Sequence, residues 1–225
     1  MLVCLFDIDG TLLASGGAGK AALETALRED FGVRTIRHVP YSGRTDRAIV
    51  RDLFCLHDID ETPAHLSKVL TGYLARLPDC LRRHQGRVLP GILELLEFLR
   101  GRDNVAVGLL TGNVRAGAEA KLGHFGLFEH FAFGGFGDHH FERDDVAREA
   151  LEAIHRHVGP HVQSDQVWVI GDTPLDVGCA RAIGANVAAV ATGSHPRAEL
   201  TTCAPDIVLD DLSDFRTLLK MWKQA

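Results

Sequence analysis

The sequence predicts an α/β fold in which a Rossmann-like parallel sheet carries an inserted α-helical subdomain. Short apolar runs that lack polar alternation are typical of strands buried on both faces. Helical patterns alternate with the later runs, as expected when neighbouring strands run parallel. One long stretch, residues 15–87, contains helical patterns and no convincing strand. We therefore predict an α/β core of residues 1–14 and 88–225, with residues 15–87 forming a helical unit after the first strand.

The core should contain five buried strands and a weaker sixth strand at His130–Phe133. Helices are expected between the later strands, and in one of them Pro174 suits the first turn while Gly184 suits the position after the end. The five strands are predicted at Leu2–Phe6, Val105–Leu110, Val167–Ile170, Val187–Val190 and Ile207–Leu209, and the helices include Val114–Leu122, Asp144–His157 and Pro174–Ile183.

The inserted unit is predicted from apolar residues that recur at helical spacing. Such residues line one face of a helix and pack it against its neighbours. The three patterns are Leu23, Leu27 and Phe31, then Ile49, Leu53 and Leu56, then Leu66, Leu70, Tyr73, Leu74, Leu77 and Leu81.

Composition and charge exclude several classes of function. The 225 residues carry 24 Lys and Arg against 30 Asp and Glu, a net charge of −6, so no basic surface for nucleic acid or an anionic membrane is expected. The five cysteines contain no CxxC pair, which favours reduced thiols in a cytoplasmic protein. No apolar run is long enough for a membrane span. The sequence leaves a monomer and a homodimer equally open.

The first polar motif follows the first strand directly. Asp7 and Asp9 are two residues apart, so on an extended strand they share a face at the carboxyl end of the sheet. Open α/β sheets bind their ligands at that edge. A divalent cation is the usual way to keep two adjacent carboxylates ionised, and Gly10 allows a sharp turn after them. The alternative interpretation is an Asx-rich turn that simply ends the strand.

Two further strand ends carry similar chemistry. Thr111-Gly112-Asn113 offers a hydroxyl and backbone N–H groups that could bind phosphate oxygens, or alternatively a helix N-cap. Asp172 and Asp176 follow a later strand, one helical turn apart, and spaced carboxylates suit Mg²⁺. Because parallel strands present their carboxyl ends at one edge, the three motifs should converge there.

In this order, the motifs Asp7-Ile8-Asp9-Gly10-Thr11-Leu12, Leu110-Thr111-Gly112-Asn113 and Gly171-Asp172-Thr173-Pro174-Leu175-Asp176 resemble the haloacid dehalogenase (HAD) superfamily of phosphohydrolases. The helical insertion resembles the type-1 cap of that superfamily, as in its phosphoglycolate-phosphatase-like members. The resemblance implies a HAD fold and a Mg²⁺-dependent hydrolase acting on a small-molecule phosphate ester.

The resemblance also implies a role for each motif residue. Asp7 would attack phosphorus and form an aspartyl-phosphate, and Asp9 would act as general acid and then general base. Asp7, the backbone carbonyl of Asp9, and Asp172 would hold Mg²⁺, with Asp176 as a further ligand or a hydrogen-bond acceptor behind them. Thr111 would bind the transferring phosphoryl group together with the backbone N–H groups of Gly112 and Asn113.

One expected residue is missing. Members of the superfamily carry a lysine near the helix that follows the third strand, and no lysine occurs here between Lys121 and Lys220. Arg143, at the predicted start of a helix, is the proposed substitute, with Arg148 as second choice. An arginine can grip phosphate with two hydrogen bonds but is larger, so the exchange is not conservative. The alternative is a solvent-facing arginine among acidic neighbours.

Arg44 opens a predicted helix of the insertion and is our candidate for binding an anionic substrate tail. Gly16-Gly17-Ala18-Gly19-Lys20 resembles a phosphate-binding Walker loop only superficially and is better explained as a hinge. Asp138-His139-His140 lacks the spacing of a metal site and is interpreted as a loop.

The expected function is hydrolysis of a small phosphorylated metabolite, with phosphoglycolate as the first candidate. A phosphomutase of the same family and a catalytically degenerate binding protein remain alternatives. A 2-haloacid dehalogenase would need neither Asp9 nor Asp172, so their presence argues against that activity. A signalling receiver domain would place its phosphorylated aspartate on a later strand, so the position of Asp7 after the first strand argues against a receiver.

Overall fold

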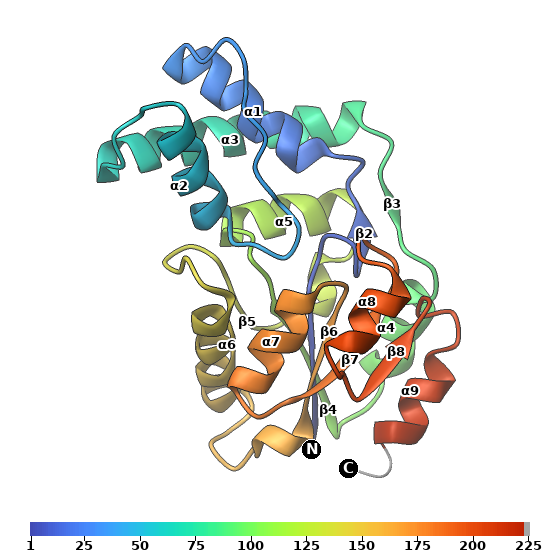
Figure 1. Cartoon of the computed structure of the whole chain (residues 1–225). Coiled ribbons are helices and arrows are strands. Elements are labelled where there is room, and N and C mark those ends of the chain that lie inside the picture. The colour runs from blue at the N-terminus through green and yellow to red at the C-terminus, as the bar shows by residue number, and fades with distance from the viewer. Residues whose placement is uncertain (223–225) are drawn as a thin grey trace.

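The computed structural model describes residues 1–222 and consists of one six-stranded parallel sheet, two layers of helices and an inserted helical unit (Figure 1). The strand order is β5-β4-β1-β6-β7-β8, and all of these strands pair in parallel. Their bounds are β1 Leu2–Phe6, β4 Val105–Leu110, β5 Gly134–Gly135, β6 Val167–Gly171, β7 Asn186–Val190 and β8 Ile207–Leu209. The predicted α/β class is confirmed.

Two hydrophobic clusters, one on each face, hold the sheet. One joins Phe6 and Leu109 to buried side chains of α4, α5 and α9. The other joins Leu5 and Leu110 to buried side chains of α6, α7 and α8. Alternate residues of a strand thus serve opposite layers, which is why these strands are apolar throughout. The helices are α4 Ile92–Arg100, α5 Arg115–His124, α6 Arg143–His157, α7 Pro174–Ala182, α8 Arg197–Thr202 and α9 Phe215–Trp222.

The inserted unit has its own core above the carboxyl edge of the sheet (Figure 1). It contains α1 Ala18–Phe31, α2 Asp46–Leu56 and α3 Pro63–Arg83, with the predicted apolar residues turned inward. Thr45 and Thr62 cap α2 and α3 by accepting backbone N–H bonds, which satisfies donors that the first turn leaves free. The chain enters through β2 (Leu13–Ala14) and returns through β3 (Arg87–Val88), and these two strands pair antiparallel.

The predicted sixth strand is placed wrongly. Residues Phe128–His130 form a 3-10 turn, and the edge strand β5 lies further along, at Gly134–Gly135. Glycine is needed there because a Cβ on Gly135 would lie 2.4 Å from the carbonyl oxygen of Val146 in α6. Close packing against a helix thus selects glycines that carry no strand signal in the sequence.

None of the helices in the described part of the chain combines the length and hydrophobicity that crossing a bilayer requires.

Candidate active site

The end of β1 places two acidic side chains beneath the inserted helices. Asp7 is buried, whereas the side chain of Asp9 is 38% exposed. After them the chain turns sharply through Gly10, whose φ of +90° favours glycine. A Cβ on Gly10 would also lie 2.4 Å from a carboxylate oxygen of Asp172. The glycine therefore lets the ends of β1 and β6 come together.

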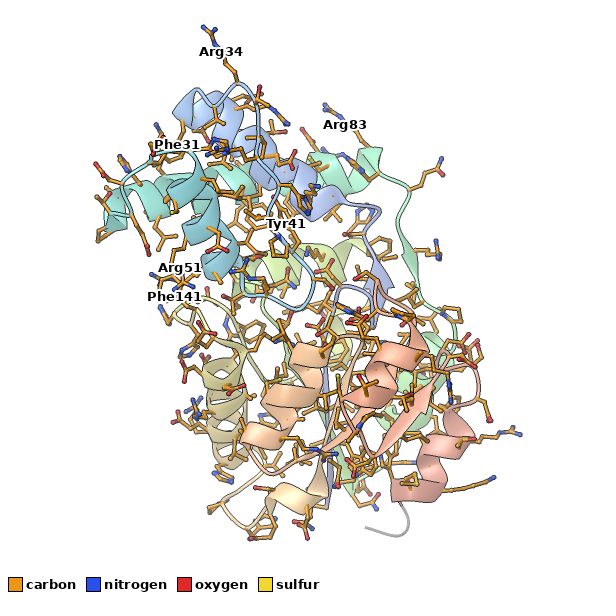
Figure 2. All side chains as sticks on the ribbon, in the orientation of Figure 1. Phe31, Arg34, Tyr41, Arg51, Arg83 and Phe141 are labelled. Atoms are coloured by element: carbon orange, nitrogen blue, oxygen red, sulfur yellow. The ribbon has the colours of Figure 1, made fainter. Side chains whose placement is uncertain are left out.

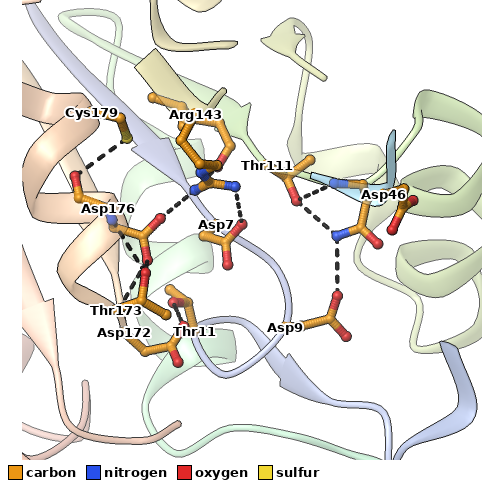
Figure 3. Close-up of polar contacts among 12 residues, drawn as sticks. Asp7, Asp9, Thr11, Asp46, Thr111, Arg143, Asp172, Thr173, Asp176 and Cys179 are labelled. Carbon is orange, nitrogen blue, oxygen red and sulfur yellow. Dashed lines mark hydrogen bonds and ion pairs between the residues drawn. The ribbon is translucent and has the colours of Figure 1, made fainter. Parts of the chain in front are cut away.

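The end of β6 supplies Asp172 and, one helical turn later, Asp176. Thr173 caps α7 and donates its backbone N–H (3.0 Å) and its hydroxyl (2.7 Å) to Asp176 Oδ2. Thr11 Oγ1 donates to Asp172 Oδ1 at 3.1 Å. Carboxylate oxygens of Asp7, Asp172 and Asp176 lie within 4.8 Å of one another (Figure 3). Hard oxygen donors this close fit a divalent cation such as Mg²⁺.

Arg143 lies within this acidic cluster. It is the first residue of α6, and its guanidinium donates to Asp7 Oδ1 (3.4 Å), to Asp176 Oδ1 and to the carbonyl of Leu110 (3.4 Å) (Figure 3). Its side chain is 4% exposed. One planar fork thus bridges an acid at the end of β1 and an acid in the first turn of α7. Arg148, the second choice, is exposed and pairs with Asp145.

Burial is the largest influence on the pKa values of Asp7 and Asp172, and it raises both. It raises the pKa of Asp7 to about 7, although the charge of Arg143 opposes this shift. It raises the pKa of Asp172 to about 9, and the neighbouring carboxylates of Asp176 and Asp7 add to the effect. Carboxyls whose ionisation is this unfavourable would gain most from a bound cation.

The end of β4 connects this cluster with Asp9. Thr111 Oγ1 accepts from the side-chain amide of Asn113 at 2.8 Å, and the same amide donates to Asp9 Oδ2 at 3.0 Å (Figure 3). Gly112 allows close approach of the insertion, since a Cβ there would lie 2.1 Å from the carbonyl oxygen of Arg44. The three predicted strand ends therefore do lie together in the structure.

Lys121 is a site residue that the motifs did not identify. It lies on α5 and is 5% exposed; its Nζ donates to Asp9 Oδ2 at 2.5 Å and to Asn113 Oδ1 at 2.6 Å. Burial lowers the pKa of this ammonium, but the carboxylates of Asp9 and Asp46 outweigh burial and the pKa is raised. In turn, the charge of Lys121 and the hydrogen bonds from Lys121, Asn113 and Ser15 keep the pKa of Asp9 below its ordinary value, against the effect of burial. A lysine on the apolar face of a helix, between Ala118 and Leu122, was the available signal.

A fourth strand end was also missed. After β7, Thr192 Oγ1 donates to the carbonyl of Gly10 at 2.5 Å. The next residue, Gly193, passes so close to Asp172 that a Cβ would lie 1.7 Å from Asp172 Oδ2. A glycine flanked by hydroxyl residues directly after a buried strand was the same kind of signal as at the other three strand ends.

The start of α2 contacts the core beside the site. Asp46 accepts the backbone N–H of Val114 at 2.8 Å, and its own N–H donates to the carbonyl of Gly112 at 2.8 Å. Thr45 Oγ1 donates to the carbonyl of Phe141 at 3.0 Å. The guanidinium of Arg51 lies 4.6 Å from the Phe141 ring centre (Figure 2). These bonds fix the insertion over the carboxyl edge of the sheet.

Arg44 lies at the wall of the site but already has an acidic partner. Its guanidinium is 2.7 Å from Asp52 and also donates to the carbonyls of Pro40 and Ala48.

The motif at residues 138–140 is structural in its described contacts, since Asp138 accepts the backbone N–H of Arg115 and His140 pairs with Glu149. Gly16 and Gly17 have φ of +64° and +86° in the turn before α1.

Core and insertion together enclose a cavity of about 330 Å³. Its core wall includes Asp7, Asp9, Asn113, Lys121, Arg143 and Asp172, and its other wall comes from α1–α3 and the segment before α2. A cavity with buried acids, a guanidinium and an ammonium at its floor is suited to bind a metal and an anion together.

A model of the haloacid dehalogenase-like hydrolase family matches residues 4–190. The chain therefore belongs to this family and is a hydrolase of that class, as its motifs predicted. The phosphoglycolate phosphatase of Synechococcus elongatus is 31% identical over 217 residues, which is 95% of each chain. That of Rhodospirillum rubrum is 29% identical over 93% of this chain and 87% of the relative.

A solved structure agrees with this assignment of the fold. CbbY from Rhodobacter sphaeroides, in complex with phosphate, matches 96% of each chain with a TM-score of 0.74 and 20% identity. At that identity the likeness shows the fold alone. The family match and the sequence relatives make the chain a HAD-family phosphatase similar to phosphoglycolate phosphatases.

Proposed function

We propose that the protein is a Mg²⁺-dependent phosphatase that hydrolyses a small phosphorylated metabolite through an aspartyl-phosphate on Asp7. The observation that carries the proposal is the meeting of Asp7, Asp172 and Arg143 at the end of β1, with Asp9 in the same cavity. This arrangement combines a nucleophile, a cation site, an anion-binding fork and a second acid, which is what phosphoryl transfer needs.

In the first half of the reaction, a carboxylate oxygen of Asp7 attacks phosphorus while the bond from phosphorus to the ester oxygen breaks. Asp9, which must first take up a proton because Lys121 lowers its pKa, gives that proton to the departing oxygen, which leaves as an alcohol. In the second half, Asp9 takes a proton from water as that water attacks phosphorus. The bond to Asp7 breaks, and inorganic phosphate and a free Asp7 carboxylate result.

Arg143 and the end of β4 are proposed to hold the phosphoryl group. The Arg143 fork contacts Asp7, so a phosphoryl group on Asp7 lies within its reach. Backbone N–H groups of Gly112 and Asn113, and the hydroxyl of Thr111, follow β4 at the same edge of the sheet. Donors fixed before the reaction stabilise charge as it develops on the phosphoryl oxygens.

Asp7, the backbone carbonyl of Asp9, and Asp172 would hold Mg²⁺. When bound, the cation would offset the repulsion between nucleophile and phosphate. For Asp176, the described bonds favour the role of an acceptor that orients Arg143, because its oxygens already receive Arg143 and Thr173.

Residues 15–87 are proposed to act as the cap that selects the leaving group. The cavity wall that they supply, and the names of the sequence relatives, make phosphoglycolate the first substrate to test. Arg44 stays a candidate for contact with an anionic tail, limited by its pairing with Asp52.

Phosphate release from a panel of phosphorylated metabolites, with Mg²⁺ and with EDTA, tests the proposal. We expect turnover that requires Mg²⁺ and falls by about 10⁴-fold or more in Asp7→Asn, because the amide is no nucleophile. Isomerisation of sugar phosphates without net phosphate release would instead indicate a phosphomutase. Absence of turnover across the panel would indicate a binding protein.

A further inference from the structure

We propose that Lys121 binds the leaving group of the substrate, through a carboxylate attached directly to the carbon that bears the ester oxygen. This inference rests on the proposed function and names a substrate class for the same cavity. Lys121 is the one buried lysine among the described residues, and it lies at the cavity floor. A buried ammonium is rarely kept without a partner that needs its charge.

The hydrogen bonds of Lys121 leave room for a ligand. An ammonium has three N–H donors, and those to Asp9 and Asn113 use two of them. Within residues 1–222 no third acceptor bonds to Nζ. Gly19 of α1 faces Nζ across the cavity. A Cβ on Gly19 would lie 3.2 Å from Nζ, so the glycine leaves this space free of a side chain. The ammonium is therefore open towards the insertion.

The distance from Lys121 to Asp9 fits a short leaving group. Asp9 gives its proton to the ester oxygen, and Nζ lies 2.5 Å from Asp9 Oδ2, so only two hydrogen bonds, both to the Asp9 carboxyl, would separate the ammonium from the ester oxygen. In a 2-phosphorylated acid, three covalent bonds separate the ester oxygen from a carboxylate oxygen, a span of about 3 Å. One end of such a leaving group can contact Asp9 while the other contacts Lys121.

The other charges around the cavity favour Lys121 over its alternatives. Arg44 is paired with Asp52, and Lys20 is exposed near Glu24. Asp46 also faces Lys121, but its carboxylate accepts the backbone N–H of Val114. A charge-assisted bond to an ammonium distinguishes a carboxylate from a neutral group more strongly than a neutral donor would.

The test compares Lys121→Met with the wild type on three esters: 2-phosphoglycolate, glycerol phosphate, which offers a hydroxyl at the same distance, and ethyl phosphate, which offers neither. Because Lys121 also bonds to Asp9, its loss is expected to lower kcat/KM for all three esters. The readout is therefore the ratio of kcat/KM between two esters, which a general loss leaves unchanged. We expect the preference for phosphoglycolate over ethyl phosphate to fall tenfold or more, and Lys121→Arg to restore part of it. Lys68→Met, which removes an exposed lysine of α3, is the matched control and should keep the wild-type ratio.

A less than tenfold fall in the preference for phosphoglycolate over ethyl phosphate overturns the inference. If kcat/KM for glycerol phosphate falls as much as that for phosphoglycolate, the choice of a carboxylate is overturned. Binding to an Asp7→Asn background separates this result from the proposed reaction. There, calorimetric titration should show phosphoglycolate losing tenfold or more in affinity when Lys121→Met is added, while inorganic phosphate changes less than threefold. If the wild type hydrolyses no ester, the proposed function fails, and this titration alone decides the subsite. The proposed role of Lys121 is overturned if both ligands lose affinity equally, or if phosphoglycolate binds no more tightly than inorganic phosphate.

Discussion

Two ion clusters at the floor of the cavity differ in what their cation can do. In the first, the Arg143 side chain is 4% exposed and its acids Asp7 and Asp176 are 8% and 0% exposed. In the second, the side chain of Lys121 is 6% exposed, but that of its partner Asp9 is 38% exposed. A guanidinium that bridges two buried acids holds a fixed geometry, whereas an ammonium beside a half-open acid can exchange partners. The fixed cluster is suited to the phosphoryl group and the open one to the part of the substrate that varies.

Removing Arg143 would break the fixed cluster and have the largest effect. Arg143→Met leaves Asp7 and Asp176 buried without their counter-ion, so we expect a loss of about 3–5 kcal/mol in the free energy of unfolding. Arg143→Lys should recover part of the stability but keep kcat about 10²-fold low, because one ammonium cannot replace the fork. Denaturant unfolding and phosphate release measure the two effects. Arg148→Met, which breaks an exposed pair, should change stability by less than about 0.5 kcal/mol, and an equal loss there would contradict the comparison.

The pH dependence of stability without metal would sharpen the comparison. Burial raises the pKa of Asp7 from 3.8 to about 7 and that of Asp172 to about 9. Between pH 4 and these values, the folded protein holds protons that the unfolded chain has released, so stability falls as pH rises. Each such carboxyl contributes about 1.4 kcal/mol per pH unit below its folded pKa, so we expect a loss of at least about 2 kcal/mol between pH 5 and 8.5, and a fall in Tm in EDTA of at least roughly 4–8 °C.

Mg²⁺ should reverse that trend, because it favours the ionised carboxylates, and should raise Tm more at pH 8.5 than at pH 5. Asp172→Asn is the control, since it removes the carboxyl with the higher of the two pKa values and should flatten the slope in EDTA. A Tm in EDTA that rises with pH across this window would contradict the assignment of these carboxyls.

Arg44→Ala should have the smallest effect. Because Asp52 already neutralises this guanidinium, we expect KM for a carboxylated ester to rise by no more than about threefold. The measurement is KM for phosphoglycolate beside that for ethyl phosphate. A tenfold rise for phosphoglycolate alone would move the recognition of the substrate anion from Lys121 to Arg44.

Local patterns in the sequence predicted the fold and the strand-end motifs because both depend on short-range regularities. Buried strands, helix caps and a pair of acids two residues apart can be identified without knowing the tertiary contacts. Arg143 was chosen by elimination, because no lysine occurs between Lys121 and Lys220. Its contacts with Asp7 and Asp176 are in keeping with that choice, while its chemical role stays a prediction.

The remaining site residues depend on contacts between distant segments. Lys121 lies eight residues beyond Asn113 on a helix, and its place in the cavity depends on contacts with Asp9 of the core and on the approach of Gly19 from α1. Gly193 has meaning only beside Asp172, and Gly112 only beside Arg44. The position of the edge strand likewise depends on how closely α6 approaches Gly135. No pattern within one segment contains this information.

The pairing of β2 with β3 has a consequence for how this chain could change. Leu13 lies opposite Val88 and Ala14 opposite Arg87, so the chain leaves the core and returns to it at one place. A tight turn could join these two strands directly, and a different domain could be grafted between them without moving the ends of β1, β4 or β6. The segment between β2 and β3 could therefore be exchanged, and substrate specificity with it, while the strand ends that would carry the reaction stay in place.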